Sequence, residues 1–170
     1  MALIRDATTE DVRVLAPIER TADTMFAAVG HPEFVGAGTI SDEYAIRAVA
    51  EGRIRVAAVD GLVVGWLLVS RLDGELFLSQ LSVDPAHGRR GIGTALLRDC
   101  IERATSAGEP SILLDTQADV AWNAPWYVRH GFEVVPADQW TAGLSARATA
   151  QQAEGFDWAT RVFMRRTLAR

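Results

Sequence analysis

Apolar and polar residues alternate or recur at helical spacing along most of the chain. Three strand-like stretches follow one another closely, at 53–59, 62–70 and 75–83. Asp60-Gly61 and Asp73-Gly74 separate these stretches, and such dipeptides favour two-residue hairpin turns. The pattern therefore predicts an antiparallel meander.

Apolar spacing and turn residues predict the remaining elements. Further strands are expected at 3–5, 111–116, 132–135 and 161–167, and helices at about 12–19, 22–28, 41–51, 93–106, 122–130 and 144–154. A strand, a crossover helix and another strand imply parallel pairing of 75–83 with 111–116. We expect a mixed α/β (α+β) fold in which helices flank a twisted sheet of six or seven strands. No linker or repeat interrupts the chain, so residues 1–170 are predicted to form a single domain.

Composition narrows the class of protein. The chain has 170 residues, of which 49% are hydrophobic and 23% charged, as is ordinary for one soluble domain. Its longest apolar run, Leu62–Val69, is too short to cross a bilayer, and its first residues lack a signal-peptide pattern, so we expect no membrane association. The one cysteine, Cys100, lies on an apolar helix stripe and is predicted to fill the core in a reducing, cytoplasmic compartment. The net charge of −5 weighs against a nucleic-acid partner.

The most informative stretch, Leu81–Leu97, reads as a buried strand, a glycine-rich turn and the start of a helix. The free N–H groups and partial positive charge of such a helix end favour phosphate. Glycines let the backbone approach a ligand, and Arg89 and Arg90 add forked donors. The stretch is not a P-loop, because Thr94 and not Lys follows Gly93. It is not a dinucleotide fingerprint either, because Leu96 stands where a small residue is needed.

Two blocks resemble the GNAT superfamily of N-acetyltransferases. Val83-Asp84-Pro85 followed by Arg89–Leu97 resembles the acyl-CoA signature, with Gly91 and Gly93 at its two small positions. Gly88 departs from the signature, which usually has Gln or Arg there. The block Asn123–Phe132 resembles a later motif, in which Tyr127 precedes Gly131 by four residues.

The resemblance implies acetyl-CoA as co-substrate and a set of residues that bind it. Backbone groups of Leu81 and Val83 would meet the pantetheine arm and the thioester, and Arg89 through Thr94 would hold the pyrophosphate. Asn123 would contact the pantetheine arm, and Tyr127 would lie near the sulfur and protonate the leaving thiolate. The implied donor-binding set is Leu81, Ser82, Val83, Gly88, Arg89, Arg90, Gly91, Ile92, Gly93, Thr94, Asn123 and Tyr127.

Some of these residues have a second interpretation. Asn123 also suits the N-cap of the 122–130 helix, and both roles can hold together. His130 is expected to bond the carbonyls at the end of that helix. The three histidines are scattered without paired spacing, so no metal site is predicted.

The expected reaction is direct attack of a primary amine on the thioester. The acceptor would be an amine-bearing small molecule, peptide or protein, with Met25–Gly38 and Pro136–Gly155 shaping its pocket. No general base is assigned, because the stretch that often supplies a Glu reads Leu78-Ser79-Gln80-Leu81, and Ser79 and Gln80 can only order a water.

The other candidates for a base are His31, Glu33, Glu75 and Asp115. The missing base leaves an alternative open, a non-catalytic acyl-CoA-binding sensor or a subunit of a complex. Monomer and homodimer both remain open.

Overall fold

The computed structural model describes residues 1–169, whose strands form a seven-stranded mixed sheet with the order β1-β2-β3-β4-β5-β7-β6. The strands are β1 Leu3–Asp6, β2 Ile54–Val59, β3 Leu62–Leu72, β4 Glu75–Val83, β5 Ser111–Gln117, β6 Glu133–Val134 and β7 Arg161–Thr167. The α-helices are α1 Val12–Asp23, α2 Asp42–Ala50, α3 Ile92–Ser106, α4 Ala124–Val128 and α5 Ala142–Ala153. The predicted mixed sheet flanked by helices is confirmed.

The described chain divides into two compact units. The first comprises Met1–Val69 and Ser79–Cys100, and the second comprises Ser70–Leu78 and the described part of Ile101–Arg170. Among the described residues, no helix has the length and apolar character needed to span a membrane.

Both predicted hairpin turns are present. The φ angles are 50° and 81° at Asp60 and Gly61, and 51° and 83° at Asp73 and Gly74. Two successive residues in the left-handed region are typical of the type I′ turn, whose twist suits antiparallel strands. The Asp-Gly dipeptides thus set the boundaries of β2, β3 and β4.

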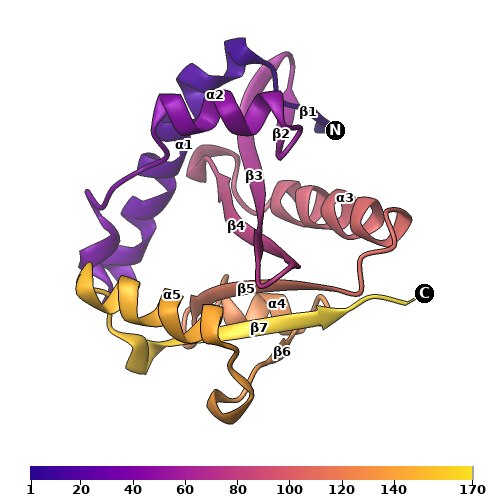
Figure 1. The fold of residues 1–170 in the computed structure, drawn as a ribbon. Helices are drawn as coiled ribbons and strands as arrows, with labels where there is room; N and C mark the ends of the chain where they lie inside the picture. Colours follow the sequence, from indigo (N-terminus) through magenta and orange to yellow (C-terminus); the bar gives the residue numbers. More distant parts are fainter. Residues whose placement is uncertain (170) are drawn as a thin grey trace. The chain divides into compact units, whose positions relative to one another are not determined.

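The core of the first unit lies between its strands and the helices α1 and α2, which run close together in Figure 1. Ile54 and Val56 point to this core together with Trp66, whose indole N–H donates to the carbonyl of Leu15 at 3.0 Å. Successive strand residues face opposite sides. Arg55 accordingly points the other way and bonds Asp99 of α3 at 2.8 and 3.0 Å.

Strand β5 is the centre of the second unit, and Figure 1 shows α5 and α4 on opposite sides of β5 and β7. Leu113 packs with Leu144 and Ala148 of α5, so the odd-numbered residues of β5 face that helix. The even-numbered residues face α4. The described register of β4 with β5 is parallel, as predicted, and pairs Leu76 with Ile112 and Phe77 with Leu113.

Three sequence-based boundaries were wrong. The stretch 22–28 is not a separate helix, because α1 continues to Asp23 and a 3₁₀ segment, η2 Thr24–Val29, follows it up to Gly30 at φ 89°. The helix at 122–130 shrinks to α4, which has Pro125 in its first turn. The strand at 132–135 shrinks to two residues that pair with β7.

A carboxylate of α1 forms a hydrogen bond with the segment that precedes α2. Glu19 is 8% exposed, and its Oε2 accepts the backbone N–H of Ile40 at 2.9 Å. Burial raises the pKa of Glu19 to about 7, and the nearby Asp23 adds to the rise. A buried carboxylate with a raised pKa favours the folded state only while it is protonated.

We therefore expect Glu19→Gln to stabilise the protein at pH 8 but not at pH 4.5. The folded pKa lies above the unfolded value of 4.5, so the wild type loses stability as the pH rises from about 4.5 through about 7. Glutamine keeps an oxygen for Ile40 and carries no charge, so the gain at pH 8 should be about 2 kcal/mol. Urea unfolding at both pH values measures it, with the exposed Glu10→Gln as the control. A gain of equal size at pH 4.5 would contradict the assignment.

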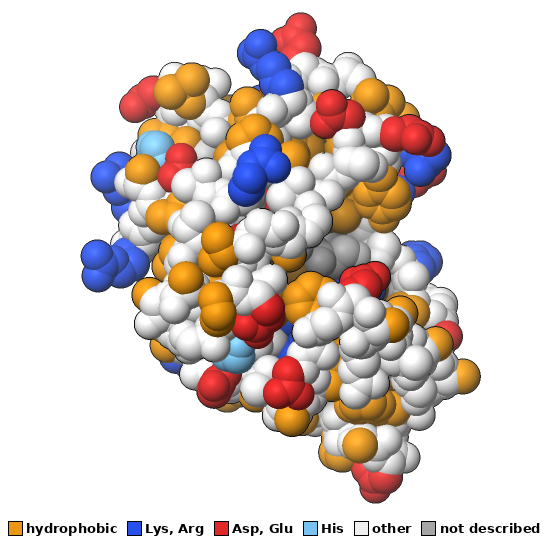
Figure 2. Space-filling model, turned by 90° about the vertical axis from the view of Figure 1, so that its left-hand side faces the viewer, with side chains coloured by type: hydrophobic (Ala, Val, Ile, Leu, Met, Phe, Trp, Pro, Cys, Tyr) orange, Lys and Arg blue, Asp and Glu red, His pale blue; other side chains and the backbone are white. Residues whose placement is uncertain are grey.

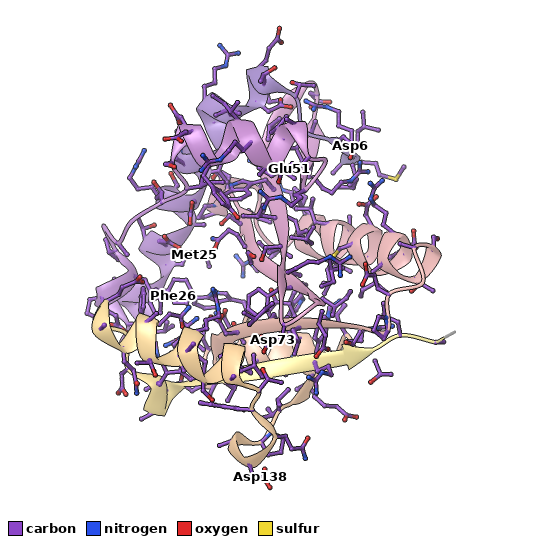
Figure 3. The ribbon with its side chains drawn as sticks, viewed as in Figure 1. Asp6, Met25, Phe26, Glu51, Asp73 and Asp138 are labelled. Atoms are coloured by element: carbon purple, nitrogen blue, oxygen red, sulfur yellow. The ribbon has the colours of Figure 1, made fainter. Side chains whose placement is uncertain are left out.

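The β3–β4 hairpin holds the beginning of α5. Asp73, labelled at the hairpin tip in Figure 3, accepts the backbone N–H of Gly143 at 3.0 Å and also bonds the hydroxyl of Thr141. A Cβ at position 143 would overlap the Asp73 carboxylate, so this contact requires glycine. These contacts fix the N-terminus of α5, which lies in the segment between β6 and β7.

Candidate functional site

The chain turns sharply between β4 and α3. The Asp84 carboxylate accepts the N–H of Ala86 at 2.9 Å, and the Asp84 N–H donates to the carbonyl of Val64 on β3 at 2.8 Å. After the 3₁₀ turn η4 Pro85–His87, Arg89 and Gly91 both take left-handed conformations, at φ 57° and 76°. A left-handed arginine is unusual and indicates a backbone held in place by its surroundings.

This turn leads into the positive end of α3. The first intrahelical bond runs from the N–H of Ala95 to the carbonyl of Gly91 at 2.9 Å, so the N–H groups of Ile92, Gly93 and Thr94 precede the helical ladder. Arg89 and Arg90 are exposed beside them. Backbone donors, helix dipole and guanidinium groups therefore coincide, which is chemistry suited to a phosphate group.

Gly88 has a local structural reason to depart from the family signature. A Cβ built there would lie 3.1 Å from the carbonyl oxygen of Pro85, tighter than ordinary van der Waals contact. Any side chain at this position would require the neighbouring backbone of η4 to give by a few tenths of an ångström. The tight turn therefore accommodates glycine most readily.

The last residues of β4 present both side chains and backbone. Ser82 is 3% exposed, and its hydroxyl accepts a hydrogen bond from the Gln80 amide at 2.8 Å. Both side chains lie on one side of the strand, and those of Leu81 and Val83 alternate with them. The structure thus brings Leu81 through Thr94 together as one continuous segment of the first unit.

Gly65 of β3 allows close packing against this segment. A Cβ at position 65 would lie 3.0 Å from the Ser82 carbonyl oxygen, 3.2 Å from Val83 Cγ2 and 3.4 Å from Ile92 Cγ2. All three neighbours belong to the candidate donor-binding set. The sequence carried a signal for it, since Gly65 interrupts the apolar run Leu62–Val69.

Gly65→Val should therefore destabilise the protein by about 1–3 kcal/mol, as overpacking usually does. It should also weaken acetyl-CoA binding, because Ser82 and Val83 must move. Urea unfolding and calorimetric titration measure the two effects. Gly38→Ala is the matched control, since nothing lies within 4 Å of a Cβ there and its φ is not in the left-handed region. A Gly65→Val variant as stable as the control would refute the packing argument.

Asn123 and Tyr127 lie in the second unit, one helical turn apart at the start of α4. The Asn123 carbonyl accepts the N–H groups of Trp126 at 2.8 Å and Tyr127 at 2.9 Å. Its side chain makes no capping bond and instead accepts the hydroxyl hydrogen of Thr116 at 2.5 Å. Asn123 thus occupies the N-cap position, as predicted, and it caps the helix through its backbone carbonyl and not through its side chain.

Tyr127 is held in an aromatic setting. It is 7% exposed, and its ring meets those of Trp126 and Phe132 edge-on, with centroids 4.9 and 5.4 Å away. His130 Nδ1 lies 2.9 Å from the Trp126 carbonyl, as predicted for a residue near the helix end. These contacts fix the position of the tyrosine ring within its unit.

Two of the candidate bases prove to be engaged by arginine. Both Asp115 oxygens are bonded, by Arg147 and by Arg161, and the side chain is 4% exposed. Burial raises the pKa of Asp115, but the charges and hydrogen bonds of the two arginines outweigh it and lower the pKa below its ordinary value. Glu75 bonds Arg165 at 2.9 and 3.1 Å. The Asp115 carboxylate, held in this way, is a poor proton acceptor.

The other two candidates form a pair with each other. His31 is 6% exposed, and its Nδ1 lies 2.9 Å from Glu33 Oε1 across Pro32. A carboxylate beside one ring nitrogen fixes the tautomer and the orientation of the imidazole. Within residues 1–169, no group of three or more His, Cys, Asp or Glu side chains is arranged to hold a metal ion.

Comparison with known proteins identifies the family. The Acetyltransferase (GNAT) family model matches residues 24–132. The tRNA-acetylating toxin of Mycobacterium tuberculosis (strain ATCC 25618 / H37Rv) is 30% identical over 130 residues, which cover 74% of this chain and 70% of that protein. The residues matched by the family model, 24–132, contain both the turn before α3 and the block around Tyr127.

Solved structures share the fold over nearly the whole chain. PaiA N-acetyltransferase from Thermoplasma acidophilum, in complex with coenzyme A, superposes with a TM-score of 0.74 at 16% identity, covering 98% of this chain and 99% of that one. The ribosomal-protein-S18-alanine N-acetyltransferase from Escherichia coli gives 0.69 at 18% identity, covering 100% and 96%. The sequence blocks, the sheet and the family match agree: the chain belongs to the GNAT acetyltransferase family and is an acyl-CoA-dependent N-acetyltransferase.

Proposed function

We propose that this chain transfers the acetyl group of acetyl-CoA to a primary amine by direct attack on the thioester. The observation that carries the proposal is the turn at Gly88–Thr94, where backbone donors, the helix dipole and two arginines coincide. In the reaction the amine nitrogen bonds the carbonyl carbon and the C–S bond breaks. The nitrogen loses a proton to a base, and the thiolate leaves with a proton from an acid.

Each donor-site residue has a proposed part in this reaction. Backbone groups of Leu81 and Val83 bond the pantetheine arm and the thioester carbonyl, and Arg89 through Thr94 hold the pyrophosphate. Asn123 donates to the pantetheine arm. Tyr127 protonates the departing sulfur. In this scheme the whole of residues 1–170 acts as one catalytic domain.

Removing a proton from the amine is more demanding than the departure of the thiol. Amine pKa values run from about 8 for an α-amine to about 10.4 for a lysine, so the acceptor is largely protonated at neutral pH. The thiol leaving group, with a pKa of about 8.5, departs more readily. Since Asp115 and Glu75 are paired with arginines, the His31–Glu33 pair is the best-supported candidate base.

The acceptor is proposed to be a small amine or a peptide and not a large RNA. The net charge is −5, and Figure 2 shows acidic and basic side chains interspersed on the face it draws. Arginines of both units are already paired with carboxylates, among them Arg5, Arg55, Arg147, Arg161 and Arg165. An RNA-binding face usually presents unpaired basic side chains.

One relative nevertheless favours a second candidate acceptor, a tRNA. The tRNA-acetylating toxin shares 30% identity with this chain. Steep weakening of activity with added salt would support this candidate, because phosphate contacts release counterions. A small amine or a neutral peptide should show little salt dependence.

Thermal melts with acetyl-CoA, CoA, ATP and NAD test the donor site. A ligand at about 100 times its dissociation constant stabilises by about 2.7 kcal/mol, which is about 5–10 °C for a domain of this size. We expect this shift with acetyl-CoA and CoA alone. No shift with them, or an equal shift with ATP and NAD, would overturn the proposal.

A further inference from the structure

Thr116 places a buried hydroxyl on the α4 side of β5. The residue is 5% exposed, and a buried hydroxyl needs a hydrogen-bond partner. Its Oγ1 donates to Asn123 Oδ1 at 2.5 Å. The hydroxyl therefore connects β5 with the residue that precedes α4.

Asn123 is free to make this bond because its backbone performs the capping. Its φ and ψ angles of −113° and −120° lie outside the usual helical and extended regions. In this conformation its carbonyl serves the first turn of α4, and its side chain makes no bond to that turn. The amide is left to Thr116.

The Thr116 hydroxyl also fixes which way the amide faces. An asparagine oxygen only accepts hydrogen bonds and its nitrogen only donates them. With Oδ1 at the hydroxyl, Nδ2 faces the other way. This nitrogen is buried and has no hydrogen-bond partner among residues 1–169. Buried donors without a protein partner are rare, and a role toward a ligand is one reason to keep them.

We propose that Thr116 is a positioning residue of the donor site, whose hydroxyl orients the Asn123 amide so that its NH₂ group meets a carbonyl oxygen of the acyl-CoA pantetheine arm. The inference rests on the proposed function, in which Asn123 contacts that arm. Without the hydroxyl, the amide can rotate by 180° and present its oxygen. Two carbonyl oxygens repel each other, so donor binding should weaken.

Calorimetric titration with acetyl-CoA tests this role in the full chain. Thr116→Val keeps the side-chain shape without the hydroxyl and should weaken binding about 3- to 10-fold, the range of one hydrogen bond. Thr116→Ser keeps the hydroxyl and should bind within about twofold of the wild type. In an Asn123→Ala background, Thr116→Val should cause no further loss, because the two residues act as one unit.

The outcomes separate the inference from the proposed function. Absence of acetyl-CoA binding by the wild type would overturn both. Wild-type binding with an unaffected Thr116→Val or Asn123→Ala variant would overturn the inference alone. The inference would also be overturned if Thr116→Val weakened acetyl-CoA binding as much in the Asn123→Ala background as in the wild type, because this would indicate a general structural effect. If Thr116→Val does not fold, Thr116→Cys, a weaker donor of similar size, replaces it.

Discussion

Replacing Tyr127 by Phe should lower kcat about 100-fold and leave acetyl-CoA binding nearly unchanged. General acid catalysis contributes about 10²–10⁴-fold, and the low pKa of a thiol leaving group places this case at the lower end. The ring contacts with Trp126 and Phe132 do not involve the hydroxyl, so phenylalanine should keep the local packing. Thiol release with an accepted amine measures kcat, and calorimetry measures donor binding.

The only other tyrosine of the chain provides the control. Tyr44 accepts a hydrogen bond from Arg53 at 3.0 Å, so Tyr44→Phe removes a comparable hydroxyl. Its kcat should equal that of the wild type. A loss smaller than about twofold for Tyr127→Phe would refute the general-acid role and leave only a positional one.

Replacing Asp115 by Asn should reduce the free energy of unfolding by about 3 kcal/mol at pH 7. The change leaves two guanidinium groups without their counter-charge, and breaking a buried ion pair usually costs about 3–5 kcal/mol. The lower end applies because the Arg147 side chain is 33% exposed and can be solvated in part. For a chain of this length, Tm should fall by about 6–12 °C.

The loss of stability caused by Asp115→Asn should be smaller at acid pH. The folded pKa of Asp115 lies below the ordinary value of 3.8, so its contribution is complete above about pH 4 and is lost as the pH falls through the folded value. Urea unfolding at pH 7 and pH 3 measures the difference. Asp138→Asn, at the exposed position labelled in Figure 3, is the control and should change neither value. An Asp115→Asn variant as stable as this control at pH 7 would show that the arginines do not depend on Asp115.

Local signals in the sequence predicted most of the fold. The Asp-Gly pairs specified both hairpins, and Ser41 was the recognisable start of α2, where its hydroxyl accepts the N–H of Tyr44. Helix length was less predictable. Nothing local showed that α1 would continue to Asp23 or that 24–29, which buries none of its residues, would form a 3₁₀ segment.

Part of the candidate site was likewise predictable from local sequence, and part of it was not. Glycine spacing and the paired arginines indicated the donor turn, and the spacing from Tyr127 to Gly131 indicated the second block. Thr116 had no sequence signal, because its role depends on a contact with Asn123 across seven residues. Asp115 stayed among the candidate bases for the same reason, since its partners Arg147 and Arg161 are distant in sequence.

The most direct test of acetyl transfer is to incubate the protein with acetyl-CoA and a panel of amines, and to measure free thiol and acetylated amine together. The sequence has no lysine, since all 17 of its basic residues are arginine, so acetylated lysine must come from the acceptor. We predict one equivalent of N-acetylated product for each thiol released, with both lost in the double variant Arg89→Ala, Arg90→Ala. Stabilisation by acetyl-CoA without thiol release for any acceptor, including peptides and tRNA, would contradict catalysis and favour a non-catalytic acyl-CoA sensor.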